Sequence, residues 1–237
     1  MQDKEEKIEF KERENGLLWP YYQGKKAWSA SSLISILKQI EYEDKKIPIF
    51  VLQKAAKNGK LFHEIIQNFI QSGSDLPNYS DLKISTKTGE KLKETIEFIK
   101  RNNQVINAKC FLGSERLHYT FYKGILLAAY VDLEFNNNYI VELKTNNGSM
   151  NESPLTLLAF QIQLLVQHLC SGKEVYLLWS TGNGVTFHKF SISNKLLKAF
   201  DILIDLLKKK DDYSLIEKRK IVENILGSYS PEKLIVL

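Results

Sequence analysis

The spacing of apolar residues predicts a helical first half of the chain. Up to about residue 105, apolar side chains recur every three to four positions, which is the period of one helix face. A serine within 29–32 is suited to cap the first helix, and Pro48 fits the first turn of the second. Gly59 is a potential break in that second helix, and a third helix is expected at about 88–101.

Between residues 107 and 145 the pattern changes to that of β-strands. Three short segments, 107–121, 124–136 and 139–145, alternate β-branched and aromatic residues with polar ones. The triplet Asn136-Asn137-Asn138 joins the last two segments, and Asn tolerates the positive φ angles of tight hairpins. We therefore predict an antiparallel meander in this region.

The rest of the chain predicts one helix, another hairpin and two further helices. The expected elements are a helix at 155–170, strands at 175–180 and 185–192, and helices at 194–209 and 214–225. This order predicts a mixed α/β fold, in which a central mixed sheet is flanked by helices and preceded by a helical part. We expect an N-terminal arm (1–27) and one domain (28–237) made of a helical part (28–105), a sheet core (106–192) and C-terminal helices (193–237).

Composition restricts the class of protein without selecting a function. Hydrophobic residues make up 43% of the chain and charged residues 26%, as in ordinary globular proteins. No apolar run approaches the roughly 20 residues that cross a bilayer, and the Lys- and Glu-rich start differs from a secretory signal. We therefore expect a cytoplasmic protein without a membrane partner. The formal charge of +5 is compatible with a polyanionic partner but identifies none.

Two absences limit the chemistry that the chain can perform by itself. Cys110 and Cys170 lie far apart and belong to no CxxC motif, so we expect packed, reduced thiols rather than a disulfide or a zinc site. The sequence contains no GxxxxGK[ST] phosphate loop. Any ATP-driven motor would therefore have to be a separate helicase or recombination protein.

Asp132, Glu142 and Lys144 have the clearest chemical potential. Side chains alternate between the two faces of a strand, so Glu142 and Lys144 point the same way. The Asn turn brings Asp132 onto the neighbouring strand, and its face depends on a register that the sequence leaves open. Two carboxylates and the backbone carbonyl of Leu143 are hard oxygen ligands of the kind that Mg²⁺ prefers. Lys144 would orient or deprotonate a bound water, or stabilise charge on a phosphate.

The alternative is that Glu142 and Lys144 form an ion pair on an exposed sheet face. Ile140, Val141 and Leu143 argue against it, because they mark a largely buried strand. Charged side chains are rarely buried without a partner or a function.

Asp132 followed by Glu142-Leu143-Lys144 resembles the core of the PD-(D/E)XK nuclease superfamily, and the flanking sequence resembles its RecB-type exonuclease branch. In that branch a Ser-x-Ser helix start, a Gly-x-x-x-His segment and an acidic residue precede the Asp, and a Gln-bearing helix follows the (D/E)XK. This chain has the same elements in the same order over roughly residues 28–170: Ser29-Ala30-Ser31, Gly59 to His63, Glu115, Asp132, Glu142 to Lys144, and Gln161-Ile162-Gln163.

The resemblance implies a restriction-endonuclease-like sheet with a metal site on it. Asp132 and Glu142 would bind the metal, and Lys144 would assist the attacking water. His63 would add a metal ligand from a helix. A histidine that is merely packed or exposed near an apolar helix face is the alternative for His63.

Two further roles follow from the same resemblance. Glu115 would be an additional carboxylate, behind the ligands or at a second metal. A cross-strand pair with Arg116 or Lys109 is its alternative. Gln163 would hold Lys144 or contact DNA, and its alternative is a hydrogen-bonded polar residue on an apolar helix.

Some positions depart from the family pattern. Ala129 stands where a Gly commonly precedes the Asp, and Gln167 stands where an aromatic residue often follows the motif Gln. We choose Gln163 over Gln161 as the motif residue because Phe160 lies three positions before it. The four-cysteine iron–sulfur cluster of some relatives cannot be built here.

The sequence therefore predicts a Mg²⁺-dependent deoxyribonuclease of repair or phage replication, most simply an exonuclease, in which Mn²⁺ can substitute. A structure-specific or restriction-type endonuclease and a non-catalytic nucleic-acid-binding module are the alternatives. The residues do not discriminate RNA from DNA as the substrate.

Two basic segments are compatible with a nucleic-acid partner. Lys208-Lys209-Lys210 would end a helix, or contact phosphate. The segment 19–28 places aromatic residues beside Lys25 and Lys26, and would either pack onto the core or stack on single-stranded bases. We favour packing for these aromatic side chains.

Overall fold

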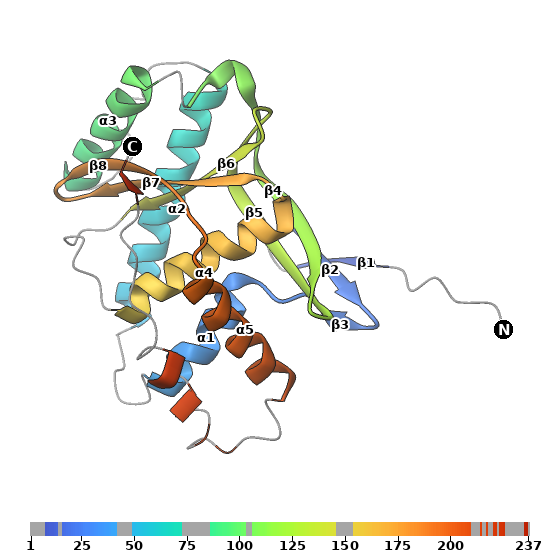
Figure 1. The fold of residues 1–237 in the computed structure, drawn as a ribbon. Coiled ribbons are helices and arrows are strands. Elements are labelled where there is room, and N and C mark those ends of the chain that lie inside the picture. The colour runs from blue at the N-terminus through green and yellow to red at the C-terminus, as the bar shows by residue number, and fades with distance from the viewer. Residues whose placement is uncertain are drawn as a thin grey trace.

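A mixed six-stranded sheet forms the centre of the molecule (Figure 1). The computed structural model describes residues 8–13, 16–41, 49–72, 86–102, 106–145, 154–209, 214, 217, 220–221, 223–225 and 235–236. The sheet has the order β4-β5-β6-β7-β8-β9. Its strands are β4 (Phe111–Tyr122), β5 (Ile125–Phe135), β6 (Tyr139–Thr145), β7 (Glu174–Thr181), β8 (Gly184–Lys189) and β9 (Ile235–Val236).

Helices cover both faces of this sheet. They are α1 (Ala30–Glu41), α2 (Ile49–Ser72), α3 (Thr86–Arg101), α4 (Pro154–Ser171) and α5 (Asn194–Lys208). One core joins α1, α4 and α5 to the sheet, and a second joins α2 and α3 to its opposite face. β6 and β7 are parallel because α4 crosses between them, whereas the other neighbouring strands are antiparallel. The predicted mixed sheet flanked by helices is confirmed.

Local signals account for most element boundaries. The Ser29 hydroxyl accepts the Ser32 N–H at 3.1 Å and so caps α1. The Asn turn contains Asn138 at a φ of 63°, which allows the tight β5–β6 hairpin. The potential break at Gly59 is absent, because one helical Gly costs only about 1 kcal/mol and the α2 turns after it bury apolar residues. Within the helix predicted at 214–225, the described residues 217, 220–221 and 223–225 are helical.

Two small features differ from the prediction. The N-terminal arm forms an antiparallel sheet of β1 (Glu9–Glu12), β2 (Leu18–Tyr22) and β3 (Lys25–Lys26), at the far end of the β4–β5 hairpin (Figure 1). The region predicted as C-terminal helices, 193–237, ends in the strand β9, which exists only by pairing with β8. Neither the N-terminal sheet nor β9 is predicted from the sequence, because such short strands form only by pairing with other strands.

Trp19 packs the N-terminal sheet against the main sheet. Its side chain is buried against Leu126 and Ala128 of β5, and its indole N–H donates to the Ala27 carbonyl at 3.0 Å. The prediction that the Trp19 side chain packs onto the core is therefore confirmed. Its ring is not exposed for stacking on a ligand.

Both cysteines and the possible membrane-spanning helices can be assessed within the described residues. Cys110 and Cys170 are free, and burial raises the pKa of the Cys170 thiol to about 12. No helix in the described part of the chain is both long and apolar enough to cross a membrane.

Candidate active site on strands β5 and β6

The register of β5 against β6 decides where Asp132 lies. Leu133 pairs with Val141, so the same register continued by one residue places Asp132 opposite Glu142. At that point the backbone pairing between the two strands ends. The Leu143 N–H instead donates to the Asp132 carboxylate at 2.8 Å. The opening between the strands thus brings a carboxylate of β5 against the backbone of β6.

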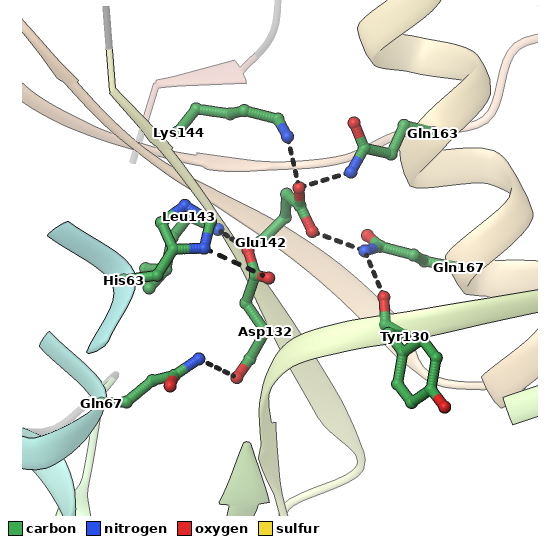
Figure 2. Close-up of polar contacts among 9 residues, drawn as sticks. All are labelled: His63, Gln67, Tyr130, Asp132, Glu142, Leu143, Lys144, Gln163 and Gln167. Carbon is green, nitrogen blue, oxygen red and sulfur yellow. Dashed lines mark hydrogen bonds and ion pairs between the residues drawn. The ribbon is translucent and has the colours of Figure 1, made fainter. Parts of the chain in front are cut away.

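Glu142 is the centre of the polar cluster (Figure 2). Its side chain is only 2% exposed, and its carboxylate accepts a hydrogen bond from the Lys144 ammonium at 2.6 Å. Gln163 and Gln167 of α4 each donate an amide N–H to the same carboxylate. Gln167 also donates to the Tyr130 carbonyl at 3.2 Å, which ties α4 to β5. Strand and helix together hold Glu142 in one orientation.

Helix α2 approaches Asp132 from the other face of the sheet. The His63 Nδ1 lies 3.5 Å from one Asp132 carboxylate oxygen. One turn later, the Gln67 amide donates to the Asp132 backbone carbonyl at 3.4 Å. His63 and Gln67 therefore form an i,i+4 pair directed at one residue of β5, as Figure 2 shows.

The two carboxyl groups differ in their electrostatic environment. Burial and the neighbouring Asp132 raise the pKa of Glu142, and Lys144 and Gln167 only partly oppose this. Burial also acts to raise the pKa of Asp132, but the hydrogen bond and charge of His63, with the charge of Lys144, lower it below its ordinary value. The site therefore holds a stabilised carboxylate beside one whose charge is unfavourable.

The cations of the site respond to the same carboxylates. Burial acts to lower the pKa of Lys144, but the charges of Glu142 and Asp132 raise it above its ordinary value. Burial likewise opposes protonation of His63, whereas the Asp132 carboxylate raises its pKa. The charges of the two carboxylates thus favour the protonated forms of Lys144 and His63.

The donor set fits a hard divalent cation in its chemistry. Asp132 and Glu142 supply carboxylate oxygens, His63 supplies an imidazole, and Mg²⁺ binds through one or two carboxylates while keeping several waters. No group of three or more His, Cys, Asp or Glu side chains within the described residues is arranged to hold a metal ion. In the present geometry the Glu142 oxygens face Lys144 and the α4 glutamines instead (Figure 2).

Glu115 and Leu143 are also predicted site residues, but their side chains lie outside the polar cluster around Glu142. Glu115 is exposed, with a φ of 50°, in the irregular first part of β4, and it makes no side-chain hydrogen bond or ion pair among the described residues. Arg116 is bound to Glu134 rather than to Glu115. Leu143 contacts the site through its backbone N–H, which donates to Asp132.

Gln67 and Gln167 are the site residues that sequence reasoning missed. In the sequence, Gln167 stands out only because it occupies a position where relatives often carry an aromatic residue. A usable signal existed, because Gln163 and Gln167, like His63 and Gln67, are polar residues four apart on largely apolar helices. Gln163, the glutamine chosen as the motif residue, contacts Glu142.

A second buried carboxylate, Glu134, lies on β5 beyond Asp132. Its side chain is 4% exposed and is surrounded by Arg116 at 3.1 Å, His118 at 3.0 Å and Lys173 at 2.7 Å. Burial acts to raise the pKa of Glu134, but the hydrogen bonds from Lys173 and His118 lower it below its ordinary value. In contrast to Glu142, this carboxylate has two cationic partners, Arg116 and Lys173, and a hydrogen bond with His118.

The substitution Glu134→Gln is expected to reduce the free energy of unfolding by about 2 kcal/mol at neutral pH, the usual worth of hydrogen bonds to a charged group. Because the folded-state pKa of Glu134 is lowered, its contribution is complete above the unfolded pKa of about 4.3 and disappears as the pH falls through the folded value. Urea denaturation of both proteins at decreasing pH measures this. A difference that is constant with pH would contradict the assignment.

Three lysines from distant segments meet around a second surface pocket. Lys25 and Lys26 of β3 and Lys208 of α5 line a pocket of about 740 Å³ together with Tyr22 and Trp28. Among the described residues none of these lysine side chains forms an ion pair, whereas the nearby Lys123 binds Asp201 at 2.7 Å. The two basic segments singled out in the sequence thus converge in space.

Comparison with known proteins gives little guidance. No protein family and no curated protein matches the sequence. The crystal structure of a "putative exonuclease" from Eubacterium rectale matches with a TM-score of 0.44 and 10% identity, covering 87% of this chain and 84% of that chain. The crystal structure of SSO0001 matches with a TM-score of 0.37 and 10% identity, covering 85% of this chain and 75% of that chain. Similarities this low carry no argument about activity.

Proposed function

We propose that this protein is a metal-dependent DNA nuclease of the PD-(D/E)XK superfamily, RecB-type exonuclease branch. The observation that carries the proposal is the meeting of Asp132, Glu142 and Lys144 in the interior of the sheet, with Lys144 2.6 Å from Glu142. These are the positions that the family motif assigns to its metal ligands and its catalytic lysine.

The energetic cost of this cluster supports a functional role. Glu142 is buried at 2% exposure beside a second carboxylate, and both effects raise its pKa. A fold gains no stability from holding two buried carboxylates together, and perturbed pKa values of this kind concentrate at functional sites. Glu134 shows the contrasting structural solution, in which one buried carboxylate is surrounded by cations.

Asp132 and Glu142 would hold the metal, with His63 as a further ligand. The donor set of two carboxylates and an imidazole suits Mg²⁺ and also Mn²⁺. The bound ion would polarise the phosphodiester and lower the pKa of a water molecule.

The lysines and glutamines around these ligands would orient the reacting groups and bind the DNA backbone. Lys144, held by Glu142, presents a cation that can orient the attacking water or stabilise negative charge on the phosphate. Gln163 and Gln167 fix the Glu142 carboxylate from α4. Lys25, Lys26 and Lys208, which form no ion pair with the described residues, would contact the phosphate backbone away from the cleaved bond.

Purified protein is expected to degrade end-labelled linear DNA in Mg²⁺ or Mn²⁺, and to be inactive in EDTA. Closed circular DNA should remain intact, because an exonuclease requires an end. The measurement is gel analysis of both substrates under the three conditions.

The alternative functions give different patterns in the same assay. Nicking of the circle would replace the exonuclease by a structure-specific or restriction-type endonuclease. Salt-sensitive DNA binding without turnover in any metal would identify a binding module and contradict the nuclease proposal.

A further inference from the structure

A pocket of about 510 Å³ adjoins the candidate active site and shares two residues with it. Gln163 and Gln167, which both donate to Glu142, also line this pocket. Its opposite walls come from β5, α1 and the N-terminal sheet. Tyr130 of the pocket lies two residues from Asp132 on β5, a separation of about 7 Å along the strand.

The walls of the pocket are aromatic and small apolar side chains. Tyr130 and Phe160 provide partly exposed ring surface, and the buried Trp19 ring lies 5.8 Å from that of Tyr130. Ala128 and Ala129 leave the floor along β5 open because they carry only a methyl group. Pockets of this size and polarity hold small organic ligands, and aromatic walls favour a flat π-system.

Gln167, which lines this pocket, carries a buried polar atom that lacks a hydrogen-bond partner among the described residues. The Gln167 side chain is 2% exposed, and its Oε1 makes no hydrogen bond among the described residues. The amide orientation is determined by its surroundings, because Nε2 donates to both the Glu142 carboxylate and the Tyr130 carbonyl. Oε1 is therefore a buried acceptor that requires an N–H or O–H donor from a ligand or water.

A cation, the Arg13 side chain, also lines this pocket. The Arg13 guanidinium sits 5.0 Å from the centre of the Trp19 ring, and it forms no ion pair among the described residues. A guanidinium presents paired N–H donors that match a phosphate. The pocket thus combines ring surface, one buried acceptor and one phosphate-binding group.

We infer that this pocket holds one nucleotide of the substrate strand, directly beside the bond that is cut. The base lies against the aromatic walls and donates to Gln167 Oε1, and its phosphate is bound by Arg13. This inference rests on the proposed nuclease function. It supplies a structural reason for exonuclease action, since a pocket of one-nucleotide size accepts the end of a strand.

The pocket is expected to bind all four bases with similar affinity. Each base carries at least one N–H donor on its Watson–Crick edge, so a single acceptor such as Gln167 Oε1 distinguishes none of them. Stacking is similarly tolerant of sequence and is worth about 1–3 kcal/mol per base. Degradation without sequence preference follows from these two properties.

The first test is binding of deoxynucleoside 5′-monophosphates to the wild-type protein in EDTA, measured by NMR titration. The four monophosphates should bind with dissociation constants within about threefold of one another. Deoxyribose 5-phosphate, which lacks the base, should bind at least about fivefold more weakly, as expected for the loss of stacking. Equal affinity for deoxyribose 5-phosphate, or no binding at about 10 mM monophosphate, would overturn the inference.

The second test fills the pocket from its exposed rim. Ser31 and Ser35, one turn apart on α1, are exposed and line the pocket. Either Ser31→Phe or Ser35→Phe should weaken monophosphate binding at least about tenfold and lower kcat/KM on linear DNA to a similar extent. Gln71→Phe, at an exposed position of α2 outside the pocket, is the matched control and should change neither. Unchanged binding in both folded serine variants would contradict the inference.

The outcomes separate this inference from the nuclease proposal. Monophosphate binding that is lost in Ser35→Phe, in a protein without nuclease activity, would support the pocket and refute the proposed function. Metal-dependent cleavage that Ser31→Phe and Ser35→Phe leave unchanged would support the function and refute the pocket.

Discussion

Replacing Lys144 with alanine is expected to reduce metal-dependent DNA cleavage by about 10²–10³-fold or more, the usual cost of removing a group that stabilises charge in a transition state. The ammonium lies 2.6 Å from Glu142 and is 25% exposed, so it is held in one place and still accessible to a substrate. Single-turnover rates at saturating Mg²⁺ measure the chemical step directly.

The ion pair between Lys189 of β8 and Glu174 of β7 offers a matched control. Lys189 binds Glu174 at the same 2.6 Å, but both side chains are exposed. Such surface pairs contribute about 0–1 kcal/mol, so Lys189→Ala should leave both stability and cleavage nearly unchanged. Full activity in a folded Lys144→Ala protein would remove the basis for the proposed site. An equal loss of cleavage in both variants would show that the effect is not specific to Lys144.

Glu142→Gln is expected to abolish cleavage while stabilising the metal-free protein. The amide removes a buried charge from beside Asp132, and its oxygen can still accept from Lys144 and Gln163. Lys144 loses the charge of Glu142 but keeps that of Asp132. The melting temperature in EDTA should rise by about 2–4 °C for each 1 kcal/mol gained. Loss of activity together with a gain in stability is the result expected for a residue that is kept for function at a cost in stability.

Two comparisons give this second prediction its specificity. Mg²⁺ should raise the melting temperature of the wild type but not of Glu142→Gln, because only a bound ligand shifts the folding equilibrium. Glu134→Gln, the other neutralised buried carboxylate, should be destabilised instead, since it loses its ion pairs with Arg116 and Lys173 and weakens its hydrogen bond with His118. If both substitutions shifted stability in the same direction, the electrostatic contrast between the two sites would be wrong.

The elements of the fold were largely predictable because their signals are local. The period of apolar residues indicated α3 and α4, the alternation at 139–145 indicated β6, and the Asn triplet indicated the turn before it. The mixed sheet followed from the order of these elements, because a crossover helix between strands makes them parallel. The short strands β1, β3 and β9 carried no such signal, since each exists only through pairing.

The candidate site was predictable only in part. Strand alternation by itself places Glu142 and Lys144 on one face, and the structure has them in contact. Alternation does not reveal the register that sets Asp132 beside Leu143, nor the approach of His63 from a helix on the opposite face. The family resemblance named Glu115 as well, yet the bulged start of β4 leaves that side chain exposed.

The sequence by itself determined the helices, the longer strands and the chemistry available on β5 and β6, because hydrophobic period, turn residues and strand alternation act over a few neighbouring positions. Only the tertiary structure decided which distant groups meet. It brought Gln167 to Glu142, Arg13 to the neighbouring pocket, and Lys208 to the lysines of β3. These contacts join segments separated by tens to hundreds of residues, and they depend on how helices pack against the two faces of a twisted sheet rather than on any local pattern.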